Sequence, residues 1–223
     1  MSRELTITVG ESVGAVSALL DLPAKPSAVY VLAHGAGAGM THPFMADIAA
    51  RLVSRKIGVL RYQFPYMENK KGRPDPPAVA EATVRAAVQA AAKEVPGVKI
   101  IAGGKSFGAR MTSQASANGK IPDAKGLVFL GFPLHPPKQP SDTRAAHLAQ
   151  VSIPMLFLQG TRDDLADLTL LTPIIQNLSK ATLHIVPGGD HSFKLLKRDG
   201  GGTRDVMEDL AEAIEWWVGA LER

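Results

Sequence analysis

The sequence predicts an α/β protein that has a mostly parallel central sheet with helices on both faces. Two strand-like runs come first, and later runs alternate with segments whose apolar residues recur at helical spacing. The inner runs are almost continuously apolar, as strands covered on both faces must be. Because strand twist favours right-handed crossovers between parallel strands, this alternation predicts helices on both faces of the sheet.

Eight strand-like runs follow one another along the chain. They are residues 5–9, 16–20, 29–33, 58–62, 98–102, 126–130, 155–158 and 182–186. Helical spacing occurs between them, in 45–53 and 84–95, and the stretch after residue 106 is also compatible with a helix. A last helix is expected over 206–221, with one apolar face and with the tryptophan pair used in packing.

The proline-rich segments 74–77 and 133–140 are expected to be loops at the edge of the sheet. The second one follows the sixth strand-like run, where a lid would be inserted in a fold of this kind. Only about 25 residues separate Leu130 from the next run, which is too few for a large helical cap. We therefore expect a minimal lid and an open site.

The length and composition favour one ordinary globular domain. The chain has 223 residues, and we expect a single domain over 1–223. No apolar run approaches the roughly 20 residues that cross a bilayer, and the start has no signal-peptide apolar block. The absence of cysteine excludes disulfides, thiolate metal sites and a cysteine nucleophile. These features predict a cytoplasmic protein without a membrane partner.

The charge is mildly basic but scattered. The formal net charge is +4 and the sequence pI is about 9.4. The densest basic groups, in 70–73 and 194–198, have neither aromatic interleaving nor the pattern of a reading helix. We expect no nucleic-acid partner, and an anionic substrate is left open.

The segment Gly104-Lys105-Ser106-Phe107-Gly108 lies between a strand-like run and a helix-compatible stretch. This setting predicts a strand, a sharp turn and a helix, with Ser106 at the apex. Glycines flank the apex because its strained backbone leaves no room for neighbouring side chains. The pentapeptide alone is also compatible with an ordinary glycine-rich loop.

An exposed serine is a weak nucleophile, so it requires a base and a group that orients the base. His191 is the best candidate base, because it lies in a flexible loop after the last strand-like run. Asp163 is the best orienting acid, since it follows the run 155–158 and should reach the same sheet edge. Asp164 and Asp190 are the competing carboxylates, and Asp190 is better interpreted as a turn residue.

The oxyanion that develops during acyl transfer needs backbone donors. One should be the N–H of Phe107, and the second should come from the glycine-rich loop 34–39, where Ala36 is the first choice. That loop is not a dinucleotide-binding turn, because Met40 stands where the third glycine would be. A phosphate-binding loop at Gly104-Lys105-Ser106 is excluded as well, since Lys99 occupies the position of its first glycine.

Two other histidines have separate expected roles. His135 lies in a proline-bounded loop and is a candidate substrate contact, whereas His184 lies inside a strand-like run and is expected to be structural. No pair of histidines has the spacing of a metal site. The sequence therefore predicts no metal and no cofactor.

Four blocks, at 34–39, 103–108, 131–137 and 190–194, together resemble the α/β-hydrolase superfamily. The resemblance is strongest to its small, nearly lidless, dienelactone-hydrolase-like branch, which includes a testis-expressed protein and the hydrolase-like part of a chromatin-complex subunit. The order serine, aspartate, histidine also matches that fold. The resemblance implies Ser106 as nucleophile, Asp163 as acid and His191 as base. The chain departs from the family in having Ala109 where glycine is common.

These features predict a serine hydrolase that acts on a small ester or related acyl compound through an acyl-enzyme. The alternative is a noncatalytic interaction module that retains the fold, with the proline-rich segment 133–140 as its surface. A haloalkane dehalogenase is disfavoured, because its nucleophile is normally a carboxylate. The sequence identifies neither the acyl group nor the oligomeric state.

Overall fold

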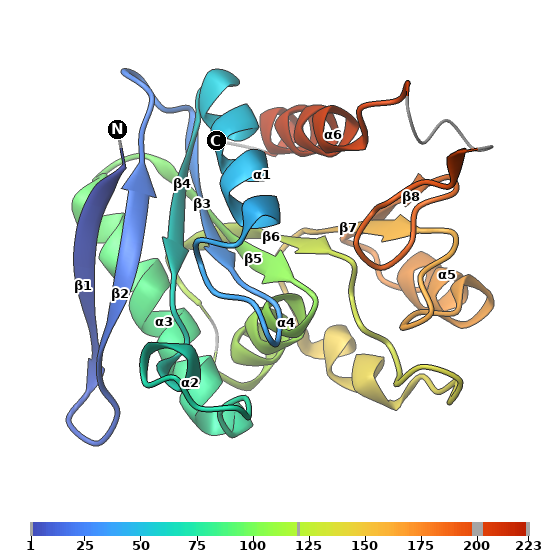
Figure 1. The fold of residues 1–223 in the computed structure, drawn as a ribbon, viewed down its shortest axis with the longest axis horizontal. Coiled ribbons are helices and arrows are strands. Elements are labelled where there is room, and N and C mark those ends of the chain that lie inside the picture. Colours follow the sequence, from blue (N-terminus) through green and yellow to red (C-terminus); the bar gives the residue numbers. More distant parts are fainter. Residues whose placement is uncertain (1, 120, 198–202, 222–223) are drawn as a thin grey trace.

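A computed structural model describes residues 2–119, 121–197 and 203–221. They contain one eight-stranded sheet with the strand order β1-β2-β4-β3-β5-β6-β7-β8 (Figure 1). Strand β2 is antiparallel to β1 and to β4, and all other neighbours are parallel. The strands are β1 (Arg3–Gly10), β2 (Gly14–Asp21), β3 (Ala28–Ala33), β4 (Ile57–Tyr62), β5 (Lys99–Lys105), β6 (Ala124–Leu130), β7 (Met155–Gly160) and β8 (Ala181–Val186). All eight predicted strands are confirmed.

Helices cover both faces of the sheet, as the alternation predicted (Figure 1). On one face, α1 and α6 pack against the sheet around a core that includes Leu52 and Ile214. The other face carries α3, α4 and η1, with a core that includes Val88 and Phe129. The helices are α1 (Pro43–Ser54), α2 (Pro65–Glu68), α3 (Pro77–Glu94), α4 (Phe107–Gly119), η1 (Thr143–Gln150), α5 (Leu168–Gln176) and α6 (Val206–Ala220).

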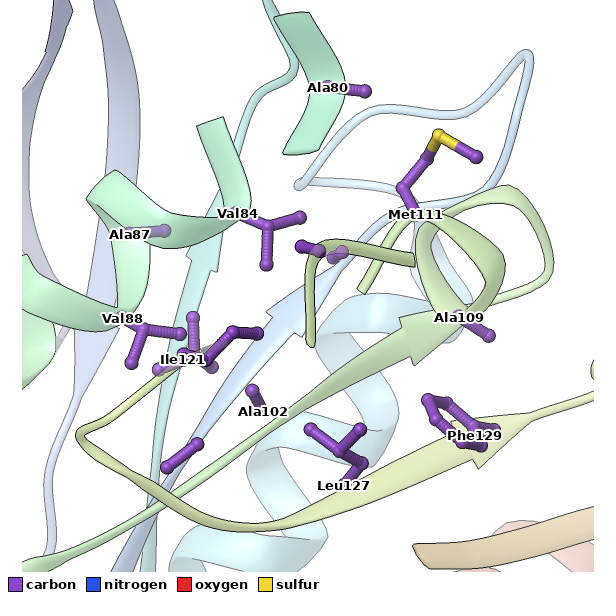
Figure 2. Packing of buried hydrophobic residues seen from close by; sticks show 14 of the residues in the cluster. Ala80, Val84, Ala87, Val88, Ala102, Ala109, Met111, Ile121, Leu127 and Phe129 are labelled. Atoms are coloured by element: carbon purple, nitrogen blue, oxygen red, sulfur yellow. The ribbon is translucent and has the colours of Figure 1, made fainter. Parts of the chain in front are cut away.

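The core between α3, α4 and the sheet is built from small and branched side chains. Figure 2 shows Val84 and Val88 of α3 directed toward Ala102 of β5 and Leu127 of β6. Every residue of β3 and β4 is buried, so β3 is apolar without alternation, and Arg61, the charged residue of β4, is paired with Asp21. Truncating a packed leucine of this kind to alanine typically lowers the free energy of unfolding by about 2–5 kcal/mol.

The last helix corrects one expectation. Trp217 is buried against the sheet, but its neighbour Trp216 is 71% exposed. Successive residues of a helix point about 100° apart, so adjacent tryptophans could not both face the core. The prediction that the pair serves packing is thus right for Trp217 and wrong for Trp216.

The segment between β6 and β7 forms no helical cap. Its one regular element is the short helix η1, which packs against α4. The predicted minimal lid is therefore confirmed. No helix in the described part of the chain has the length and apolarity that a bilayer crossing requires.

Candidate active site

Ser106 occupies a sharp turn between a strand and a helix, as the sequence predicted. Strand β5 ends at Lys105 and α4 begins at Phe107, and Ser106 between them has a φ of 52°. This left-handed conformation costs a non-glycine residue roughly 1–2 kcal/mol. A Cβ atom on Gly104 or Gly108 would lie 2.5 or 2.6 Å from the carbonyl oxygen of Ala33. The flanking glycines are thus required by the close approach of β3, and the ordinary-loop alternative is wrong.

A chain of hydrogen bonds joins Ser106, His191 and Asp163. His191 Nε2 lies 2.8 Å from Ser106 Oγ, and Nδ1 lies 2.9 and 2.8 Å from the two oxygens of Asp163. With the Nδ1 proton donated to the carboxylate, Nε2 is free to accept the hydroxyl proton of Ser106. The Asp163 side chain is only 1% exposed, so this carboxylate is shielded from water.

Neighbouring groups hold the Asp163 carboxylate in place. The backbone N–H of Leu165 donates to Oδ1 over 2.9 Å, and the side-chain amide of Gln159 donates to Oδ2 over 2.5 Å. Gln159 also accepts from the N–H of Phe132 over 2.9 Å. Its role was missed in the sequence, where the only sign was one amide in the apolar run of β7.

The two competing carboxylates lie elsewhere. Asp190 Oδ1 accepts from the N–H groups of Ser192 and Lys194, which is the turn role expected for it. Asp164 is exposed at the surface. Of the three carboxylates considered, Asp163 is the one within hydrogen-bond distance of the His191 ring.

The loop after β3 is fixed beside the serine. His34, at its start, contacts Gly35 O through Nδ1 over 2.8 Å and accepts from Phe64 N–H at Nε2 over 3.0 Å. Burial lowers the pKa of His34 to about 4, so its imidazole is neutral at pH 7. At the far end, Met40 N–H donates to the side chain of Gln63 over 3.1 Å.

A hollow of about 340 Å³ opens next to the serine. Ser106 and both predicted oxyanion donors, Phe107 and Ala36, line it together with Arg110 and Arg144. Phe107 is the first residue of α4, where backbone N–H groups have no partner within the helix. A larger hollow of about 800 Å³ includes the amino ends of β4 and β5, but none of the candidate residues lines it.

Both ring nitrogens of His135 contact backbone groups. Nδ1 contacts Pro136 O over 2.8 Å, and Nε2 accepts from Asp167 N–H over 2.9 Å. The residue is 4% exposed and bridges two loops. Substrate contact by His135 stays a prediction, and the geometry gives the residue a structural position.

A second serine–histidine contact differs from the first in its surroundings. Ser113 Oγ lies 2.7 Å from His147 Nε2, but this hydroxyl also donates to Arg110 O and is fully buried. Burial and the charge of Arg110 lower the pKa of His147 to about 4. A buried hydroxyl beside a weak base cannot attack an external substrate.

Across 2–119, 121–197 and 203–221, no group of three or more His, Cys, Asp or Glu side chains is arranged to hold a metal ion.

A mostly parallel sheet flanked by helices, with a serine at a strand-to-helix turn, defines the class of α/β hydrolases. The chain belongs to the alpha/beta hydrolase domain family, whose model matches residues 26–219. This membership supports hydrolase activity and places the chain in the superfamily that the sequence resembled.

Solved structures share the fold over nearly the full length of both chains. A serine hydrolase without a lid from Xanthomonas campestris is 22% identical, with 98% of this chain and 94% of that chain covered and a TM-score of 0.75. A dienelactone hydrolase from Anabaena variabilis is 18% identical, with coverages of 100% and 99% and a TM-score of 0.79. An esterase domain from Rhodothermus marinus is 16% identical, with coverages of 98% and 100% and a TM-score of 0.70.

Proposed function

We propose that this protein is a serine hydrolase that cleaves small esters or related acyl compounds through a covalent acyl-enzyme. The observation that carries the proposal is the continuous hydrogen-bond chain from Asp163 through His191 to Ser106 Oγ. A nucleophile, a base and an orienting acid in this arrangement form the constellation that acyl transfer requires.

The reaction follows from the positions of these groups. Ser106 Oγ attacks the substrate carbonyl carbon while its proton passes to His191 Nε2, and Asp163 stabilises the imidazolium. The N–H groups of Phe107 and Ala36 donate to the resulting oxyanion. The tetrahedral intermediate then collapses, and the leaving oxygen takes the proton from Nε2. Water releases the acyl group by the same steps with His191 again as base.

The open surroundings of Ser106 favour small or medium substrates. The hollow beside Ser106 has a volume of about 340 Å³. The segment between β6 and β7 forms no helical cap, because its helix η1 packs against α4. The similar solved proteins include a dienelactone hydrolase and an esterase domain, so ester and lactone substrates are the first to test.

The decisive experiment compares Ser106→Ala with wild type on a panel of esters, thioesters, lactones and amides. Loss of the nucleophile should lower turnover by about 10⁴-fold or more. It should also abolish labelling by a fluorophosphonate probe. The matched control is Ser113→Ala, which removes the hydroxyl of α4 that contacts His147 and should keep both signals.

Two outcomes would contradict the proposal. Labelling of Ser106→Ala at the wild-type level would remove Ser106 as nucleophile. A wild-type protein with neither labelling nor turnover would favour the noncatalytic interaction module, whose candidate surface includes the exposed residues 137–140.

A further inference from the structure

Lys105 lies directly before the proposed nucleophile, and its side chain reaches the proposed base. Lys105 Nζ donates to the main-chain carbonyl of His191 over 2.5 Å. A Cβ atom on Gly131 would lie 2.9 Å from this nitrogen, and 3.5 Å from both Asp163 Oδ2 and His191 Cε1. The ammonium, the carboxylate and the imidazole therefore surround the same small glycine.

The surroundings of this ammonium are unusual for a lysine. The rings of Phe44 and Phe193 lie 6.0 and 5.4 Å from Nζ, so aromatic faces replace much of its water. Burial lowers the pKa of Lys105 to about 8, and the charges of Asp163 and Asp190 oppose that change. The lysine is still charged at pH 7, although removing an ammonium from water is costly.

We propose that Lys105 is a positioning residue of the triad: it ties the His191 loop to the end of β5 and directs a positive charge toward the His191–Asp163 couple. This inference rests on the proposed function. Lys105 is joined to Ser106 by one peptide bond, so it can move little relative to the nucleophile. The contact therefore fixes the base relative to its own nucleophile.

The positive charge has a second effect. It attracts the Asp163 and Asp190 carboxylates, so it also draws the loops after β7 and β8 toward the end of β5. The charged and titratable groups that face Lys105 come from two loops: Asp163 after β7, and Asp190 and His191 after β8. The residue from α1 that faces it, Phe44, carries no charge.

The test is Lys105→Met, with kcat and KM measured at pH 7 and with amide hydrogen exchange of residues 187–194. We expect kcat to fall by about 10- to 100-fold with KM nearly unchanged, because the base is no longer held in place. Exchange of residues 187–194 should become faster, because the contact that holds this loop is gone.

Lys99→Met is the matched control. Lys99 is at the other end of β5, and its Nζ likewise donates to main-chain carbonyls, those of Val218 and Leu221. This variant should lower the unfolding temperature and leave kcat, KM and the exchange of residues 187–194 unchanged. Lys105→Gln, which keeps a donor without the charge, should regain part of kcat.

Hydrogen exchange separates this inference from the proposed function, because it needs no turnover. A Lys105→Met protein with wild-type kcat and wild-type exchange of residues 187–194 would overturn the positioning role. If the wild type shows no turnover, the proposed function fails, and unchanged exchange in Lys105→Met would then overturn the inference as well. Faster exchange in this loop would support the inference.

Discussion

His34 is fully buried and holds the loop that contributes Ala36 to the site. Its Nε2 accepts from Phe64 N–H, so protonation of this nitrogen would set two N–H groups against each other. The pKa of His34 is lowered from 6.5 to about 4, chiefly by burial. A residue outside the hydrogen-bond chain thus links the shape of the loop 34–39 to pH.

Acidification should therefore destabilise the protein. Above pH 6.5 His34 is neutral in both states, and below it the unfolded chain binds a proton that the folded chain refuses until about pH 4. Between pH 6.5 and about pH 4, His34 alone should lower the free energy of unfolding by about 3 kcal/mol. Urea unfolding at pH 7 and pH 4.5 should show a smaller pH effect in His34→Gln than in wild type.

His147→Gln is the control for this pH effect. The pKa of His147 is also lowered to about 4, but its side-chain partner is the buried Ser113, and it does not hold the loop 34–39. Both variants should flatten the pH dependence, and only His34→Gln should also reduce activity at pH 7. An undiminished pH effect in His34→Gln would contradict the assignment of this proton to His34.

At the scale of elements, the junction of β3 and α4 decides whether the serine turn can form. A Cβ atom on Gly108 would lie 2.6 Å from Ala33 O and 2.7 Å from His34 O. Backbone atoms of a central strand cannot yield, so α4 would have to move. Such a movement would carry Phe107 and Ser106 away from the loop 34–39.

Gly108→Ala should consequently lower the free energy of unfolding by about 2–3 kcal/mol and reduce activity further than stability alone explains. The matched control is Gly219→Ala in α6, where an added Cβ would meet nothing within 4 Å. A helical glycine replaced by alanine without a clash should stabilise by about 0.5–1 kcal/mol. Equal effects of the two substitutions in thermal unfolding would count against the close-approach argument.

Hydrophobic runs predicted the strands well because a buried parallel strand leaves a strong local signal. The short helix α2, the 3-10 helix η1 and α5, which contains Pro173, were not predicted, since proline-rich or brief segments have no clear period. Gln159 and Lys105 were missed as supporting residues. Their roles depend on partners after other strands, and local sequence patterns do not report such contacts.

At the scale of the whole molecule, parallel strands gather distant residues at one edge. The loop of Ala36 follows β3, Ser106 follows β5, Asp163 follows β7 and His191 follows β8. The sequence order of strands and candidate residues was enough to predict that these residues meet. It was not enough to predict which charges surround these residues, because the charged side chains come from the helices α4 and η1 and not from the ends of the strands.

The charge around the hollow predicts a preference for acidic substrates. Arg110 of α4 and Arg144 of η1 both line it, and burial together with the charge of Arg144 lowers the pKa of Arg110. A carboxylate on the acyl group would relieve the repulsion between the two arginines. Asp75 is the one acid among the lining residues, and its carboxylate already accepts a hydrogen bond from Tyr66 N–H.

We therefore expect kcat/KM for p-nitrophenyl hemisuccinate to exceed that for p-nitrophenyl butyrate by about 10-fold or more, since one charged hydrogen bond contributes about 1.5–3 kcal/mol. Arg144→Gln should remove most of this preference while keeping turnover of the neutral ester. Lys25→Gln makes the same change in net charge at an exposed position before β3, away from the hollow, and should keep the preference. An equal loss of the preference in both variants would assign it to the overall charge of +4, and no loss in Arg144→Gln would exclude this arginine from substrate recognition.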